Sequence, residues 1–92
     1  MKIRVTVQWR LSSLPARSFT CDRKTFADFM NRKAASVDWL IADVCLTRWY
    51  FDGADWYSMP LVKYVPNNGV VRLSPQERRA KLRKSTRGFT QC

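Results

Sequence analysis

The stretch KIRVTVQWRL, residues 2–11, decides the fold that the sequence predicts. Polar or charged side chains alternate strictly with apolar ones, which is the period of two that a half-buried β-strand requires. The apolar positions are Ile3, Val5, Val7, Trp9 and Leu11. One face of this strand is therefore expected to enter a hydrophobic core. The opposite face presents the cations Lys2, Arg4 and Arg10 to solvent.

A helix is predicted from about residue 23 to residue 35. Asp22 stands immediately before it, and aspartate is a favourable N-cap residue. Phe26, Phe29 and Met30 fall on one face at helical spacing. The helix is therefore expected to pack on the sheet through this apolar face.

Residues 37–51 fit two patterns. The apolar positions Val37, Leu40, Ile41, Val44 and Cys45 have the spacing of a helix. The later part, CLTRWYF, contains β-branched and aromatic residues that favour a strand. We predict a strand that ends near Phe51 and starts between residues 38 and 44, and residues 37–44 stay open between helix and strand.

A hairpin is predicted after this strand. Asp52 and Gly53 form a dipeptide that favours tight turns, and aromatic runs flank it on both sides. The returning strand, WYSMPLVKYV, spans residues 56–65. Pro60 lies inside this strand, so we expect an edge position or a bulge there, because proline cannot donate a backbone hydrogen bond.

The stretch SPQERRAKLRKSTR, residues 74–87, is predicted to form a basic helix. Ser74 is the N-cap residue, Pro75 occupies the first helical position, and Glu77 completes a capping box. The stretch has almost no apolar side chain to bury, so a partner is expected to supply its ordering contacts. Residues 88–92 are predicted to be a frayed tail.

These elements predict a single α+β domain over residues 1–92. Its small antiparallel sheet of about three strands carries one packed helix and the basic C-terminal helix. The aromatic residues expected in the core are Trp9, Phe26, Phe29, Trp49 and Phe51. The candidates for surface aromatics are Tyr50, Tyr57 and Tyr64.

The chain is strongly basic and its charge is uneven. The formal net charge is +10, from 17 Lys and Arg residues against 7 Asp and Glu residues. Residues 1–55 carry 9 basic and 6 acidic residues, whereas residues 56–92 carry 8 basic residues and 1 acidic residue. The last third of the chain is therefore expected to attract an anionic partner such as nucleic-acid phosphate.

Arg79, Arg83 and Arg87 recur at i, i+4 and i+8, so on a helix they form a ridge that can follow phosphates. A solvated helix without a partner is the alternative interpretation of this charge run. The candidate residues for contact with nucleic acid or another partner are Arg78, Arg79, Lys81, Arg83, Lys84, Arg87, Lys2, Arg4 and Arg10.

Catalysis is not expected, and no catalytic residue, cofactor or small-molecule substrate is predicted. The chain has no histidine, so Ser–His and Cys–His nucleophile pairs are excluded. It also has no glycine-rich phosphate-binding loop. The sequence therefore favours a binding protein.

No metal site and no disulfide framework are predicted. The chain has only three cysteines and no histidine, whereas a structural zinc site takes four such ligands. Cys21 and Cys45 are expected to be small buried side chains, and Cys92 a frayed terminal thiol. No run of 18 apolar residues exists, so contact with a membrane is not expected and a cytoplasmic location is.

As a whole chain, the sequence resembles the small basic anti-CRISPR proteins of bacteriophages. The segments that carry the resemblance are the opening MKIRVTVQWR, the hairpin RWYFDGADWY and the tail SPQERRAKLRKSTR. The resemblance implies a non-catalytic inhibitor in the bacterial host cell that docks on a type I CRISPR-Cas surveillance complex. It would contact the subunits that form the crRNA backbone and block the pairing of target DNA with the guide.

Two other classes stay open at this point. A stand-alone DNA- or RNA-binding regulatory protein would use the same basic surface on naked nucleic acid. A structural protein of a phage or a ribosome-associated protein would use the basic tail as an anchor. Salt dependence separates the first class from an inhibitor, because a stand-alone binder loses affinity steeply as salt rises.

Overall fold

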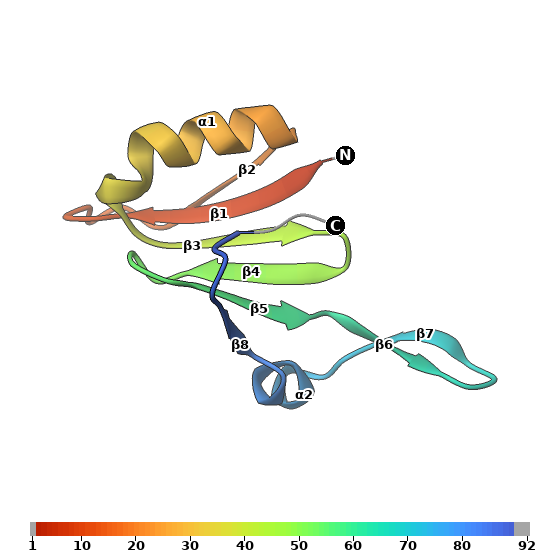
Figure 1. The fold of residues 1–92 in the computed structure, drawn as a ribbon. Coiled ribbons are helices and arrows are strands. Elements are labelled where there is room, and N and C mark those ends of the chain that lie inside the picture. The colour runs from red at the N-terminus through yellow and green to blue at the C-terminus, as the bar shows by residue number, and fades with distance from the viewer. Residues whose placement is uncertain (1, 90–92) are drawn as a thin grey trace.

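Eight β-strands and two α-helices build the part of the protein that the computed structural model describes, residues 2–89 (Figure 1). The elements are β1 (Ile3–Trp9), β2 (Arg17–Cys21), α1 (Arg23–Lys33), a 3-10 helix η1 (Ala34–Ser36), β3 (Val37–Val44), β4 (Thr47–Phe51), β5 (Trp56–Pro60), β6 (Val62–Val65), β7 (Gly69–Arg72), α2 (Pro75–Ala80) and β8 (Arg83–Ser85). Six strands form an antiparallel sheet in the order β2-β1-β3-β4-β5-β8, and β6 and β7 form a two-stranded sheet.

The prediction of an α+β domain with about three strands is therefore wrong, because the fold is mostly β. The basic C-terminal helix over residues 74–87 is also wrong. Helix α2 ends at Ala80 after six residues, and residues 83–85 form strand β8 on the edge of the large sheet. A helix with no apolar face gains nothing from packing, whereas an edge strand satisfies its backbone groups on its neighbour.

Strand β1 confirms the predicted alternation in its first part. Ile3, Val5 and Val7 have 0–1% of their surface exposed, and the residues between them face the other side. The register shifts at Gln8 and Trp9, where β1 pairs with the start of β3. Leu11 follows in a turn with φ of 59° and is fully exposed. Its predicted place in the core is therefore wrong, because the strand ends before it.

The segment 37–51 forms two strands rather than one. Cys45 and Leu46 join β3 to β4 in a two-residue turn, with φ values of 52° and 59°. Positive φ at both positions is typical of the tight turns that match the twist of a hairpin. Glycine or asparagine usually marks such a turn, and neither is present here, so the sequence pattern did not reveal it.

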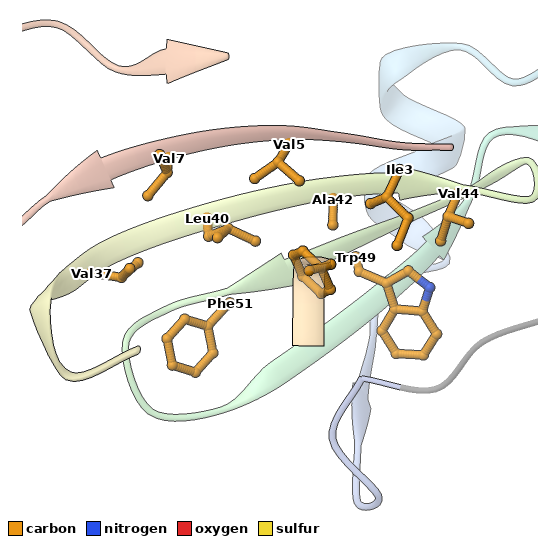
Figure 2. Close-up of a cluster of buried hydrophobic side chains, with 10 residues drawn as sticks. Ile3, Val5, Val7, Val37, Leu40, Ala42, Val44, Trp49 and Phe51 are labelled. Carbon is orange, nitrogen blue, oxygen red and sulfur yellow. The ribbon is translucent and has the colours of Figure 1, made fainter. Parts of the chain in front are cut away.

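Helix α1 covers one face of the large sheet and closes the core. It begins and ends close to the predicted bounds, and its N-cap Asp22 accepts a hydrogen bond from the Thr25 N–H at 2.8 Å. Phe26 is 2% exposed, and Phe29 is half-buried. The strand side chains beneath the helix point to the same side of the sheet (Figure 2); they are Ile3, Val5, Val7, Val37, Leu40, Ala42, Val44, Trp49 and Phe51.

Phe89 packs on this core from the C-terminal side of the described chain. Its ring centroid lies 4.9 Å from that of Phe26, 5.2 Å from that of Trp49 and 5.3 Å from that of Trp56. The frayed tail predicted from residue 88 is therefore wrong at this position, because burial of an aromatic ring orders the segment. Residues 90–92 of that predicted tail, including Cys92, lie outside the described residues.

The hairpin between β4 and β5 is confirmed. The Asp52 side chain accepts hydrogen bonds from the N–H groups of Ala54 and Asp55, at 2.9 and 2.7 Å, and these bonds lower the pKa of its carboxyl. Gly53 has φ of +98°, which glycine adopts without strain. The predicted returning strand is wrong as one element, because β5 ends at Pro60 and the chain continues as β6 in the second sheet.

Strands β6 and β7 form an arm that projects away from the large sheet (Figure 1). The side chains near its tip are exposed, with 75% for Tyr64 and 63% for Val70. Leu73 ties the base of the arm to the domain, since it is 3% exposed and its N–H donates to the Leu61 carbonyl at 2.9 Å. The arm is thus fixed at its base rather than along its length.

Helix α2 begins with the predicted capping box. Ser74 Oγ accepts from the Glu77 N–H at 3.2 Å, and Glu77 Oε1 accepts from the Ser74 N–H at 3.1 Å. Lys63 of β6 donates to the second carboxylate oxygen of Glu77. The cap therefore joins the short helix to the arm.

The Glu77 cap gives the protein a defined acid sensitivity. The Lys63 hydrogen bond and the Ser74 backbone bond lower the pKa of Glu77 from 4.5 to about 2. Because the pKa of Glu77 is lower in the folded protein than in the unfolded chain, ionised Glu77 stabilises the fold fully at pH values above 4.5. This stabilisation is lost as the pH falls through about 2. As the pH is lowered from 4.5 to about 2, we expect the free energy of unfolding to fall more in the wild type than in Glu77→Gln. Urea unfolding across this pH range measures the difference, and identical pH profiles would contradict it.

Candidate nucleic-acid interface

The large sheet has one covered face and one face without a helix. Helix α1 and Phe89 pack on the first face through their aromatic rings. Helix α2 lies beyond the strands near β5 and β8 (Figure 1). No helix lies against the second face, the open face from here on, in the part of the chain that the structure describes.

A row of side chains crosses the open face from β1 to β8. Residues that pair across antiparallel strands share a face of the sheet. The register places five such side chains next to one another, in the order Thr6, Ile41, Tyr50, Tyr57 and Lys84. The centroids of the two tyrosine rings lie 6.3 Å apart. Aromatic rings beside a cation on an open sheet suit the stacking of unpaired bases next to their phosphates.

A second row on the open face is dominated by charge. It contains Arg4, Asp43, Arg48 and Met59 in neighbouring strands. Arg48 donates two hydrogen bonds to the Asp43 carboxylate, at 2.8 and 3.0 Å. This contact raises the pKa of Arg48 and commits its charge to Asp43. Arg4 is exposed and forms no ion pair with a described carboxylate, so its charge is available to a partner.

The structure separates the cations that the sequence placed on one helix. Arg78 and Arg79 lie on α2, Lys81 caps its C-terminal end, and Arg87 follows β8. The predicted ridge of Arg79, Arg83 and Arg87 does not exist, because these residues lie in three different segments. Within β8, neighbouring side chains point to opposite faces. The strand register therefore places Lys84 on the open face and Arg83 on the other side.

Three of the nine candidate cations have partners within the protein. Arg10 Nε donates to the Val37 carbonyl at 3.0 Å, and Arg78 donates to the Leu73 carbonyl at 3.4 Å. Lys84 lies 3.5 Å from Asp55 in an exposed ion pair, which contributes little to stability. No side-chain partner within residues 2–89 is found for the other six, Lys2, Arg4, Arg79, Lys81, Arg83 and Arg87.

The sequence indicated part of the open face. Alternation in residues 47–51 placed Trp49 and Phe51 on one side and Arg48 and Tyr50 on the other, and the structure confirms this sorting. Tyr57 was correctly kept as a surface candidate, because it lies on the open face, although half-buried. Ile41 was not predicted on this face, since residues 37–44 stayed open between helix and strand.

The cysteines differ from the prediction. Cys21 is half-buried with a free thiol, and burial, with a smaller effect of Asp22, raises its pKa. Cys45 is exposed in the turn between β3 and β4, so its predicted burial is wrong. Within residues 2–89, no three His, Cys, Asp or Glu side chains gather as metal ligands. Neither described helix combines the length and apolar character that crossing a membrane requires.

No family model, no curated protein and no solved structure matches this chain.

Proposed function

We propose that this protein is a non-catalytic bacteriophage inhibitor that docks on a type I CRISPR-Cas surveillance complex in the cytoplasm of the bacterial host. Its basic surface would lie near the crRNA backbone and block the binding and hybridisation of target DNA. The observation that carries this proposal is the open face, where the partly paired Lys84 lies beside Tyr57 and the unpaired cation Arg4 lies in the neighbouring row. The resemblance of the whole chain to small basic anti-CRISPR proteins supports the same assignment.

The charge distribution fits a ribonucleoprotein partner better than a neutral protein surface. Six of the candidate cations lack a described side-chain partner, and an anionic partner supplies the missing countercharges. The exposed apolar residues of the β6–β7 arm, Tyr64 and Val70, offer protein contacts on another part of the surface. A ribonucleoprotein offers RNA phosphates to the basic residues and protein side chains to the apolar arm.

The second candidate function is a stand-alone regulatory protein that binds DNA or RNA. The tyrosine pair of the open face favours it, because aromatic rings beside cations bind single strands without any protein partner. The two functions differ in the partner that holds the protein when salt is raised.

Purified protein tests both functions when it is mixed with type I surveillance complexes and, separately, with naked RNA and DNA. We expect the protein to co-elute with a surveillance complex at moderate salt and to abolish the shift of labelled target DNA by that complex. Naked strands should bind more weakly and dissociate as salt rises. Tight binding to naked strands with no effect on any type I complex would favour the regulatory protein instead.

A further inference from the structure

A groove lies at the end of β5, where β4, β8 and the C-terminal end of α2 come together. Its volume is about 350 Å³, within the usual range of small-ligand sites. The residues that line it are Thr47, Ser58, Met59, Pro60, Lys81 and Arg83. The groove lies apart from the tyrosine row of the open face, and of its residues only Lys81 and Arg83 were predicted to bind a partner.

The groove carries two positive charges and no lining carboxylate. Lys81 and Arg83 are both exposed, and neither takes part in any ion pair of the described residues. Two uncompensated cations at one hollow create a local positive potential. An anion entering the groove would therefore meet both charges without displacing a competing carboxylate.

Hydroxyl groups complement these charges. Ser58 pairs with Arg83 in the β5–β8 register, so the two side chains share one face of the sheet. Thr47 pairs with Pro60 on the neighbouring strand pair. Its hydroxyl donates to the Cys45 carbonyl over 3.4 Å, a long hydrogen bond that a stronger acceptor can replace.

We propose that this groove binds one phosphate group of a nucleic-acid backbone. Arg83 and Lys81 supply the charge, and the hydroxyls of Ser58 and Thr47 donate hydrogen bonds to the phosphate oxygens. Pro60 forms an apolar wall, against which the sugar of the same nucleotide packs. This inference rests on the proposed contact with nucleic acid and assigns one phosphate of that contact to a defined place.

Free phosphate presents the same oxygens as the backbone, so the test uses both. Amide chemical shifts of labelled protein are followed by NMR during titration with inorganic phosphate, and separately with a single strand that lacks terminal phosphates. A strand of roughly ten nucleotides lies within the usual site size of single-strand binders. We expect the strand to shift the amides of Thr47, Ser58 and Arg83 at concentrations where inorganic phosphate does not.

Paired variants identify the groups that bind. We expect Lys81→Gln with Arg83→Gln to weaken binding of the strand by about a hundredfold or more, since each of the two charged hydrogen bonds is worth about a tenfold change or more. Lys24→Gln with Arg32→Gln removes the same charge from exposed positions of α1 and serves as the control. Ser58→Ala tests the hydroxyl without changing any charge, and it should weaken binding by a smaller factor.

Two outcomes would contradict the proposal that the groove binds a phosphate group. One is equal loss of affinity in the control pair and the groove pair, which would reduce the effect to net charge. The other is saturation by the strand without shifts at Ser58 and Arg83. The proposed function is judged separately with the surveillance complex. If a groove variant still binds and inhibits that complex, only the proposed phosphate site is wrong. If the wild type binds the strand but not the complex, only the proposed inhibitor function is wrong.

Discussion

Replacing Phe26 with alanine is expected to cost about 3–5 kcal/mol of folding free energy, as truncation of a buried phenylalanine usually does. Phe26 is 2% exposed and is the one buried residue of α1. Its ring contacts those of Trp56 and Phe89, with centroids 6.3 and 4.9 Å apart. Domains of this size are stable by only about 5–15 kcal/mol. The substitution should therefore unfold a large fraction of the protein near body temperature.

Urea unfolding followed by circular dichroism measures this loss. Asn31→Ala, at an exposed position of the same helix, is the matched control and should change stability by less than about 0.5 kcal/mol. A loss below about 1 kcal/mol in Phe26→Ala would mean that α1 does not close the core.

Reversing the charge of two open-face cations is expected to weaken partner binding strongly. Arg4→Glu together with Lys84→Glu should lower the affinity for the surveillance complex, or for a single strand, by about a hundredfold or more. Both residues are exposed, so the fold should persist. The dependence of log affinity on log salt for a single strand should also become shallower, by roughly 0.7 for each phosphate that the variant no longer neutralises.

The matched control reverses Lys24 and Arg32 on α1, which lies on the covered side of the sheet. It makes the same change in net charge and should reduce affinity far less. Equal reductions of affinity in both double variants, with circular dichroism spectra of a folded protein, would assign the effect to overall charge. The open face would then not be the binding surface.

The ambiguity of residues 37–44 has a physical origin. At the register shift between β1 and β3, Trp9 pairs with Val37 while Gln8 pairs with Trp39. Asp38 is the extra residue of this bulge, so the buried positions Val37 and Leu40 are three residues apart. That spacing imitates a helix, although the segment is a strand. A pattern read without its partner strand cannot reveal such a shift.

Strand β8 was beyond prediction for another reason. Residues 83–85 are Arg, Lys and Ser, which show no alternation of apolar side chains. The capping box at Ser74 correctly indicated where a helix begins, but nothing in the local sequence marked its end at Ala80. The end is set by the free edge of β5, which lies far away in the sequence. Cations on the outermost strand also discourage further strands from adding to that edge.

The cations of residues 79–87 were misplaced because strand β8 was not predicted. The strand alternation correctly put Arg4 on the exposed side, because local periodicity decides the face of a strand. The position of Lys84 beside Tyr57 depends on the pairing of β8 with β5, which links residues 27 positions apart in the sequence. Local patterns can identify such residues as basic, but only the sheet topology brings them together.

The pairing of β8 with β5 has a kinetic consequence. It rests on three residue pairs and closes a long loop that contains the β6–β7 arm and α2. Loop closure of this length is entropically unfavourable, and few interactions offset it, so β8 should dock late in folding and open first from the native state. Slow isotope exchange of backbone amides would then be confined to β1, β3 and β4. Each opening of β8 also takes Arg83 away from Ser58. A bound anion that contacts both residues would therefore lower the population of the open state by mass action.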